Sequence, residues 1–331
     1  MDGPEARPHK HQIYTHANKI IGSAVLTLVA LLYIFFALTF TIAKSSVLYM
    51  TPLFFIGVRM VIAGTLFLGY IYKQKSDYKW PLWKDKYLFV QLIMFHIFFA
   101  YVFEFWALPY VTSSKAALIF NASPFITALL VRFLYKEHLS IKKKIGLIVG
   151  FIGFLPILIP QVLQEEMLGS ILFFSYPELA LIIAVISSCY GWLLFKELST
   201  KHNYAPLMLN GVGMFCGGLL SLVVWGITDG AMPLSAAYPW YIALSKSLFY
   251  MAILILIANT ISYNLYGFLL RYYSATFLSF AGFLTPLFSA FFGWLFLGEL
   301  LSWHFFSAAC IILIGLAIFY QDELYSTRSK Q

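Results

Sequence analysis

Long apolar segments dominate this sequence and constrain its fold more than any other feature. Ten runs of about twenty mainly apolar residues follow one another, joined by short polar or proline-bearing links. A helix needs about 20 such residues to cross the hydrocarbon core of a membrane. Backbone amides in hydrocarbon must pair within their own segment, so runs of this length are expected to be helical. The sequence therefore predicts an all-α integral membrane protein with ten transmembrane helices.

The predicted spans cover almost the whole chain and leave no room for a soluble domain. They are 20–43, 50–72, 87–108, 113–135, 145–163, 177–197, 206–227, 247–270, 274–297 and 302–320. Only 11% of the residues are charged, whereas a soluble domain carries about a quarter. No basic patch accompanies a soluble fold, so we expect the lipid bilayer as a partner and no nucleic acid.

Positive charges are distributed unevenly among the predicted loops. With the N-terminus in the cytoplasm, seventeen of the 22 Lys and Arg residues fall in cytoplasmic segments. The opposite side holds Lys44, Lys115 and Lys246, with the acidic Glu165, Glu166 and Asp229. Because Lys and Arg are enriched in cytoplasmic loops, segments 1–19 and 321–331 are both predicted to be cytoplasmic. The expected location is the cell (inner) membrane, with several passes.

The two halves of the chain repeat one pattern. With an offset of 162, Tyr101 corresponds to Tyr263 and Pro124 corresponds to Pro286. The same offset relates Tyr110 to Tyr272, Thr127 to Ser289, Glu137 to Glu299, Ser140 to Ser302 and Gly153 to Gly315. Earlier residues repeat with an offset of 154, which relates Pro52 to Pro206, Gly57 to Gly211, Met60 to Met214 and Gly64 to Gly218.

This repetition predicts two inverted five-helix repeats, at 20–164 and 177–320. Five is odd, so the second copy enters the membrane from the opposite face. Such halves are common in secondary transporters, where they exchange conformations and open a central site to each side in turn. Pro124 and Pro286 are then paired irregularities and candidate hinges, because proline removes a helical hydrogen bond. The alternative for either proline is a packing kink with no direct role.

Three stretches resemble EamA-type proteins, the ten-helix branch of the drug/metabolite transporter superfamily. They are "GVRMVIAGTLFL", "ALPYVTSSKAALIFNASPFITALLVRFLYKEHLSIKKKIGLIVGFIGFLPI" and "RYYSATFLSFAGFLTPLFSAFFGWLFLGELLSWHFFSAACIILIGLAIF". The resemblance covers about residues 20–320. It implies a basket-like helical bundle with a central cavity, and a small-molecule substrate such as an amino acid or a nucleotide-type metabolite. Some members exchange S-adenosylmethionine for S-adenosylhomocysteine.

Polar side chains inside the apolar spans are the candidate site residues. Charged groups at mid-bilayer are costly and usually functional. Arg59 is the clearest case, and either a substrate anion or an internal ion pair with Glu104 would offset its charge. The full candidate set for substrate binding is Arg59, Tyr101, Glu104, Asn121, Tyr190, Asn210, Asn259, Ser262, Tyr263 and Tyr266. Trp106 and Trp192 add aromatic candidates, and His96 is interpreted as a buried histidine.

Helical spacing groups part of this set on one face. Tyr101 and Glu104 lie on one face of the third predicted span, together with Ile97 and Ala100. Their counterparts in the eighth span are Asn259, Ser262, Tyr263 and Tyr266. A polar stripe within an apolar span is expected to face a cavity. Ordinary hydrogen bonding between helices is the alternative.

Three classes of function remain open at this point. A secondary transporter working by alternating access, with an exchanger as one form of it, fits the matched halves. A membrane-embedded enzyme is the second class, but no HExxH or GxSxG motif is present. A channel or scaffold is the third. The carboxylate, amine and adenine of S-adenosylmethionine would suit Arg59, Glu104 and the aromatics, and an amino-acid or drug exporter is the alternative.

No cofactor, metal or ATP-driven motor is predicted. The three cysteines, Cys189, Cys216 and Cys310, lie in apolar stretches without a CxxC pair, and no Walker lysine motif occurs. The chain is expected to act as a monomer or homodimer.

Overall fold

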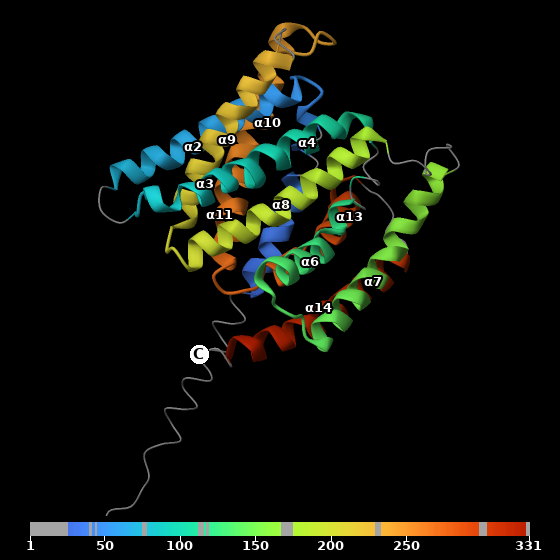
Figure 1. Cartoon of the computed structure of the whole chain (residues 1–331). Coiled ribbons are helices and arrows are strands. Elements are labelled where there is room, and N and C mark those ends of the chain that lie inside the picture. Colours follow the sequence, from blue (N-terminus) through green and yellow to red (C-terminus); the bar gives the residue numbers. More distant parts are fainter. Residues whose placement is uncertain are drawn as a thin grey trace, which may run out of the picture.

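The computed structural model is a bundle of helices (Figure 1). It describes residues 26–39, 42–43, 45–74, 78–111, 116, 119–166, 175–228, 233–297 and 303–328. Within these residues the regular structure is helical, apart from one isolated antiparallel bridge between Met50 and Leu234. The predicted all-α class is therefore confirmed for the described part of the chain. Lys44, Lys115, Asp229, Glu299 and Ser302, which entered the charge and repeat arguments, lie outside it.

The helices lie at the predicted segments, but the predicted span 274–297 is divided between two helices. After the first helix, Leu26–Thr39, they are α2 (Pro52–Lys73), η1 (Trp83–Asp85), α3 (Lys86–Gln91), η2 (Leu92–Phe99), α4 (Ala100–Ala107), η3 (Leu108–Tyr110), α6 (Ser123–Tyr135), α7 (Ile141–Glu166), α8 (Tyr176–Thr200), α9 (Pro206–Thr228), α10 (Trp240–Leu254), η4 (Ile255–Ser262), α11 (Tyr263–Leu269), α12 (Ala275–Ala281), α13 (Leu284–Leu297) and α14 (Trp303–Arg328).

Six helical stretches among the described residues are long and apolar enough to cross a membrane. They are Pro52–Lys73, Trp83–Tyr110, Tyr176–Thr200, Pro206–Thr228, Trp240–Leu269 and Phe306–Glu323. The largest differences from the predicted boundaries, among the described residues, are in α10, which begins at Trp240 rather than near 247, and in α14, which continues to Arg328 rather than ending near 320. Hydropathy marks the apolar part of a helix, and hydrogen bonding carries these two helices beyond it.

Both candidate hinge prolines lie in the first turn of a helix, directly after a break. Pro124 is the second residue of α6, and a turn at Ala122 separates α6 from the helical residues 119–121. Pro286 is the third residue of α13, and a turn at 282–283 separates α13 from α12. Amides in a first helical turn have no intrahelical partner, so proline is tolerated there. The chain is thus interrupted at equivalent places in its two halves.

A second pair of matched irregularities was not predicted. The stretches Trp83–Tyr110 and Trp240–Leu269 each contain a π-helical segment, η2 and η4 respectively. Shifted by 162 positions, η2 overlaps η4 except for one residue at each end. π-Helical turns are rare and frequently occur at functional sites.

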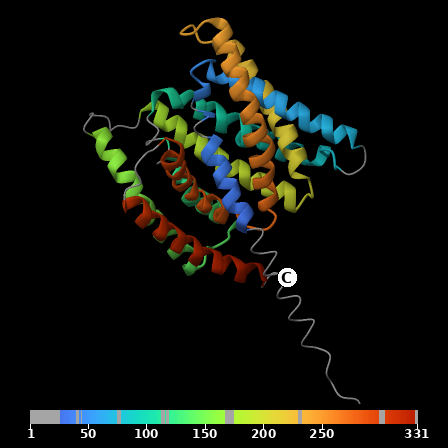
Figure 2. The same ribbon diagram turned by 180° about the vertical axis from the view of Figure 1, so that it is seen from behind.

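Counterpart helices of the two halves pack directly against each other at glycines. A Cβ on Gly64 of α2 would lie 2.4 Å from the backbone nitrogen of Phe215 on α9. A Cβ on its counterpart, Gly218, would lie 2.8 Å from the backbone nitrogen of Val61. The helices α7 and α14 approach in the same way, since a Cβ on Gly315 would lie 2.6 Å from the backbone nitrogen of Gly150. Figures 1 and 2 show α7 and α14 side by side along one edge of the bundle.

Charged side chains join the elements at the lysine-rich end of the bundle. Glu323 of α14 accepts a hydrogen bond from Lys143 of α7 at 2.6 Å and another from the backbone N–H of Ser274 at 2.5 Å. The Tyr204 hydroxyl donates to Asp85 at 2.7 Å, and Arg271 donates to the Tyr204 carbonyl at 3.0 Å. These contacts tie segments from both halves together at this end.

Candidate functional site

Arg59 is a buried cation surrounded by aromatic rings. It lies in the first half of α2, and only 2% of its surface is exposed. Its guanidinium carbon is 5.3 Å from the ring centre of Tyr101, 5.6 Å from that of Phe105 and 5.9 Å from that of Phe55. Aromatic faces attract a cation at this range. The Nε and Nη2 atoms, however, have no hydrogen-bond partner among the described residues.

Glu104 is close enough to interact electrostatically with Arg59 but does not form an ion pair with it. Glu104 lies on α4 and is partly buried. Its charge interacts with that of Arg59. Among the described residues, however, the ion pairs within 4 Å do not include either of them. Arg59 therefore keeps two buried nitrogen donors, Nε and Nη2, that meet no acceptor in the part of the chain that the structure describes.

The side chains of Tyr101 and Tyr263, one from each half of the chain, contact each other. Their hydroxyls are hydrogen bonded, with Tyr101 as the donor. These residues are counterparts in the sequence repeat, so this bond joins equivalent positions of the two halves. Tyr263 also contacts Trp192 of α8, with ring centres 5.2 Å apart, and His96 of η2, at 5.5 Å. Tyr263 thus contacts Tyr101, which lies beside Arg59, and also Trp192 on α8.

A cluster of buried amides and a histidine lies next to Tyr263. His96 is 1% exposed, and Asn210 and Asn259 are fully buried. The Asn210 side chain donates to the Asn264 side chain at 3.0 Å, and Asn259 donates to the sulfur atoms of Met60 at 3.2 Å and Met214 at 3.5 Å. Both ring nitrogens of His96 and the amide oxygens of Asn210 and Asn259 lack a partner among the described residues. Methionine sulfur is a weak acceptor, so this cluster is only partly satisfied.

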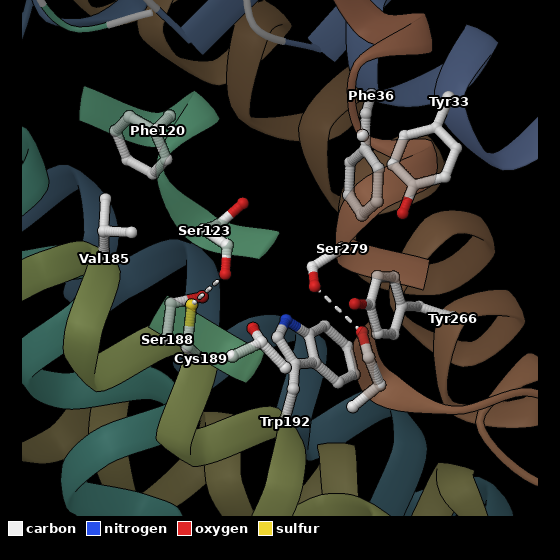
Figure 3. Close-up of a pocket in the computed structure, with 13 residues that line it drawn as sticks. Tyr33, Phe36, Phe120, Ser123, Val185, Ser188, Cys189, Trp192, Tyr266 and Ser279 are labelled. Carbon is white, nitrogen blue, oxygen red and sulfur yellow. Dashed lines mark hydrogen bonds between the residues drawn. The ribbon is translucent and has the colours of Figure 1, made fainter. Parts of the chain in front are cut away.

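A cavity opens on the other side of Trp192. It has a volume of about 140 Å³ and is bordered by Tyr33, Phe36, Phe120, Ser123, Thr127, Val185, Ser188, Cys189, Trp192, Tyr266, Ala275, Ser279 and Gly282. Figure 3 shows these side chains around a central space, with Trp192 and Tyr266 along one edge and Phe120 across from them. The rings of Trp192 and Tyr266 are stacked, with centres 4.0 Å apart and planes inclined by 28°.

The two helix breaks supply part of this cavity. Ser123 begins α6 directly after the break at Ala122, and Gly282 directly follows the last residue of α12. The Ser279 hydroxyl of α12 donates to the carbonyl of Ala275 at 2.9 Å and keeps its acceptor lone pairs for another group. The paired breaks therefore shape the cavity rather than only bending the outer surface.

The predicted site residues fall into separate places. Arg59, Tyr101, Glu104 and Tyr263 lie together, Asn210 and Asn259 belong to the buried amide cluster, and Tyr266 borders the cavity. The Ser262 hydroxyl donates to the carbonyl of Ile257 within η4. The Tyr190 hydroxyl donates to Gln91 at 2.7 Å, away from these groups. Asn121 lies at the break before α6, between the cavity residues Phe120 and Ser123.

Several cavity residues were not selected from the sequence. Tyr33 and Phe36 come from the first helix, where aromatics give no contrast in a chain with 19% aromatic residues. Ser123 and Ser279 are small hydroxyls near the two helix breaks. The one available signal was the position of Ser123 directly before Pro124, because residues at a helix break expose their side chains to the space that the break creates.

Comparisons with known proteins give the family. The model of the EamA-like transporter family matches twice, over residues 23–159 and 175–321. The S-adenosylmethionine/S-adenosylhomocysteine transporter of Chlamydia muridarum is 32% identical over 308 residues, which cover 93% of this chain and 95% of that protein. The protein of the same name from Chlamydia trachomatis serovar L2 is 32% identical, covering 86% of this chain and 85% of that protein.

A solved structure agrees on the fold. A crystal structure with 16% sequence identity has a TM-score of 0.67 and covers 91% of this chain and 98% of its own. The family and the named relatives are transporters, which confirms the prediction of a multi-pass membrane transporter rather than an enzyme. The chain belongs to the EamA-like transporter family of the drug/metabolite transporter superfamily.

Proposed function

We propose that this protein exchanges S-adenosylmethionine for S-adenosylhomocysteine across the cell (inner) membrane by alternating access. The observation that carries the proposal is the 32% identity, over 93% of this chain, to a Chlamydia muridarum protein named as a transporter of these two compounds. Ten spans, arranged as two inverted repeats at 20–164 and 177–320, would hold the site between them. The paired helix breaks before Pro124 and Pro286 are the elements proposed to change on opening.

Arg59 supports this choice of substrate. Both compounds carry an α-carboxylate, and a carboxylate can accept two parallel hydrogen bonds from a guanidinium. Arg59 has two buried donors without an acceptor among the described residues. A charge at mid-bilayer costs at least about 2.5–3.5 kcal/mol on the insertion scale. An anionic substrate bound at Arg59 would offset part of this free-energy cost. Glu104, which interacts with the charge of Arg59, is suited to the substrate amine.

Exchange in proteoliposomes tests the proposal. Purified protein is reconstituted into vesicles loaded with S-adenosylhomocysteine, and uptake of labelled S-adenosylmethionine is followed. We expect saturable uptake that internal S-adenosylhomocysteine accelerates, and none in vesicles without protein. Uptake of amino acids or drugs in place of S-adenosylmethionine would indicate the alternative exporter function.

Cysteine labelling tests the proposed orientation, in which both termini are cytoplasmic. Lys144 is exposed at the start of α7, whereas Lys143 is paired with Glu323, so Lys144→Cys is the better probe. Ala237, exposed before α10, is its partner on the opposite side. In a background lacking the three native cysteines, an impermeant reagent applied to intact cells should label Ala237→Cys and spare Lys144→Cys. The reverse pattern would invert the topology.

A further inference from the structure

The cavity beside Trp192 has the chemistry of a ring-binding site. Among its thirteen bordering residues, four are aromatic besides Trp192, four are Ser or Thr, and none is Asp, Glu, Lys, Arg or His. A charged group would find no counter-charge on these walls. A planar ring would find faces to stack on and hydroxyls at its edge, the combination that lets proteins bind nucleobases.

The stacked pair of Trp192 and Tyr266 forms the platform for such a ring. The two rings come from different helices, α8 and α11, and lie 4.0 Å apart. Phe36 adds a third ring, 6.3 Å from Tyr266 and inclined to it by 59°. These aromatics are fixed by packing, so little side-chain freedom is lost when a ligand stacks against them. Ser123 and Ser279, from the two broken helices, supply polar groups across the same space.

The charged group around Arg59 is separate from this cavity, and Tyr263 lies in contact with both. Tyr263 contacts Trp192 on the cavity side, at 5.2 Å between ring centres, and bonds the Tyr101 hydroxyl on the Arg59 side. Tyr263 and Arg59 are absent from the cavity lining. The molecule thus offers an uncharged aromatic site and a cationic site on the two sides of one tyrosine.

We propose that the cavity bordered by Trp192 and Tyr266 binds a planar nitrogen heterocycle of the purine class, and that the charged amino-acid end of the same solute binds at Arg59, beyond Tyr263. The identity of that solute rests on the proposed function; the ring site itself does not. The arrangement makes the two ends of the solute separable, because each end is recognised by different residues.

Fragments of the solute test this separation. Adenosine carries the ring without the charged end, and methionine carries the charged end without the ring. With the full-length protein in detergent, we expect adenosine binding to weaken at least tenfold in Trp192→Ala and to persist in Arg59→Gln. Methionine should compete with S-adenosylmethionine in Trp192→Ala and fail to do so in Arg59→Gln. Trp294→Ala, a tryptophan 46% exposed on α13 and outside the cavity, is the matched control and should bind adenosine normally.

A second variant keeps the test decisive if Trp192→Ala does not fold. Trp192→Phe retains a ring and the core packing, and it should weaken adenosine binding by a smaller factor. Quenching of tryptophan fluorescence by adenosine should also be larger in the wild type than in Trp192→Phe. Equal binding and equal quenching in the two proteins would overturn the ring site, as would a wild type that binds S-adenosylmethionine but no adenosine.

The result also separates this proposal from the proposed function. If adenosine binds at Trp192 and vesicles show no exchange of S-adenosylmethionine, the exchange function fails and the ring site stands. If exchange is active and Trp192→Ala exchanges with unchanged KM, the ring site fails and the function stands.

Discussion

The third and eighth predicted spans have nearly the same backbone but different chemistry. Each contains a π-helical segment followed by a tyrosine, and these tyrosines, Tyr101 and Tyr263, bond each other. Three residues further on, the first half has Glu104 and the second half has Tyr266 at the counterpart position. Glu104 belongs to the surroundings of Arg59, whereas Tyr266 borders the aromatic cavity.

The same difference appears in the helices that pack across the middle. The counterpart of Arg59 on α2 is Gly213 on α9, although the glycines at which α2 and α9 cross are preserved in both halves. Duplicated backbone therefore supplies a symmetric frame, while substituted side chains make one part cationic and another aromatic. A solute with a charged end and a ring end needs such an unequal site. The proposed exchange of conformations between the halves depends only on the shared frame, so an unequal site is compatible with it.

The largest expected effect comes from breaking the shared frame at its glycine crossing. A Cβ on Gly64 or on Gly218 would lie less than 3 Å from backbone atoms of the opposite helix, and backbone cannot move aside without separating α2 from α9. We expect Gly64→Ala and Gly218→Ala each to lower the free energy of unfolding by about 3 kcal/mol. The measurements are the melting temperature in detergent and the yield of monodisperse protein.

Gly69 provides the control on the same helix. A Cβ there would meet nothing within 4 Å, so Gly69→Ala should be neutral or should stabilise α2 by up to about 1 kcal/mol. If Gly64→Ala melts at the same temperature as Gly69→Ala, the close crossing of α2 and α9 is wrong. If the melting temperatures of Gly64→Ala and Gly218→Ala differ strongly from each other, the packing of α2 against α9 is less symmetric than the sequence repeat predicts.

The next effect sharpens the chemical difference between the halves. Arg59→Gln should weaken S-adenosylmethionine binding at least tenfold, because a hydrogen bond to a charged group contributes about 1.5–3 kcal/mol. Without ligand, its melting temperature should hold or rise, since the variant removes a buried charge that no carboxylate among the described residues pairs with within 4 Å. Arg59→Lys should restore binding only in part, because lysine lacks the planar fork.

An exposed arginine is the control for this change. Arg132→Gln on α6 should alter neither binding nor melting temperature. A clear loss of ligand-free stability in Arg59→Gln, partly recovered by adding Glu104→Gln, would instead indicate that Glu104 is the partner of Arg59. Thermal melts of the two single variants and the double variant decide between a substrate role and a structural ion pair.

Much of this fold could be predicted, because composition and periodicity determine where its helices lie and how its halves correspond. Long apolar runs indicated helices, and the offset of 162 paired Tyr101 with Tyr263 and Pro124 with Pro286. Arg59 was recognisable because a charge inside an apolar run is rare. In each case, the signal is a strong local contrast between a residue and its surroundings.

The rest depends on packing that single-sequence patterns do not encode. A π-helical segment shifts the hydrogen-bond register without changing hydropathy, so η2 and η4 could not be predicted from the sequence. The predicted polar stripe of the eighth span is divided between η4 and α11. As a result Asn259 contacts the sulfur atoms of Met60 and Met214, whereas Tyr263 faces Tyr101. Tyr33 and Phe36 join the cavity only because the first helix packs near α11 and α12.

The smallest expected effect concerns the bond at which the two halves meet. Tyr101→Phe and Tyr263→Phe each remove one hydroxyl of the same hydrogen bond and keep both rings. We expect each variant to lower the free energy of unfolding by about 1 kcal/mol, and the double variant to lose little more than either single one. Tyr110→Phe and Tyr272→Phe form a matched control pair, since these tyrosines are also counterparts but are 69% and 49% exposed. Losses that simply add in the double variant would mean that the two hydroxyls do not depend on each other. Equal and non-additive losses would instead show that the two hydroxyls stabilise the protein through one shared hydrogen bond. That bond would then join the two halves at residues that are counterparts in the repeat.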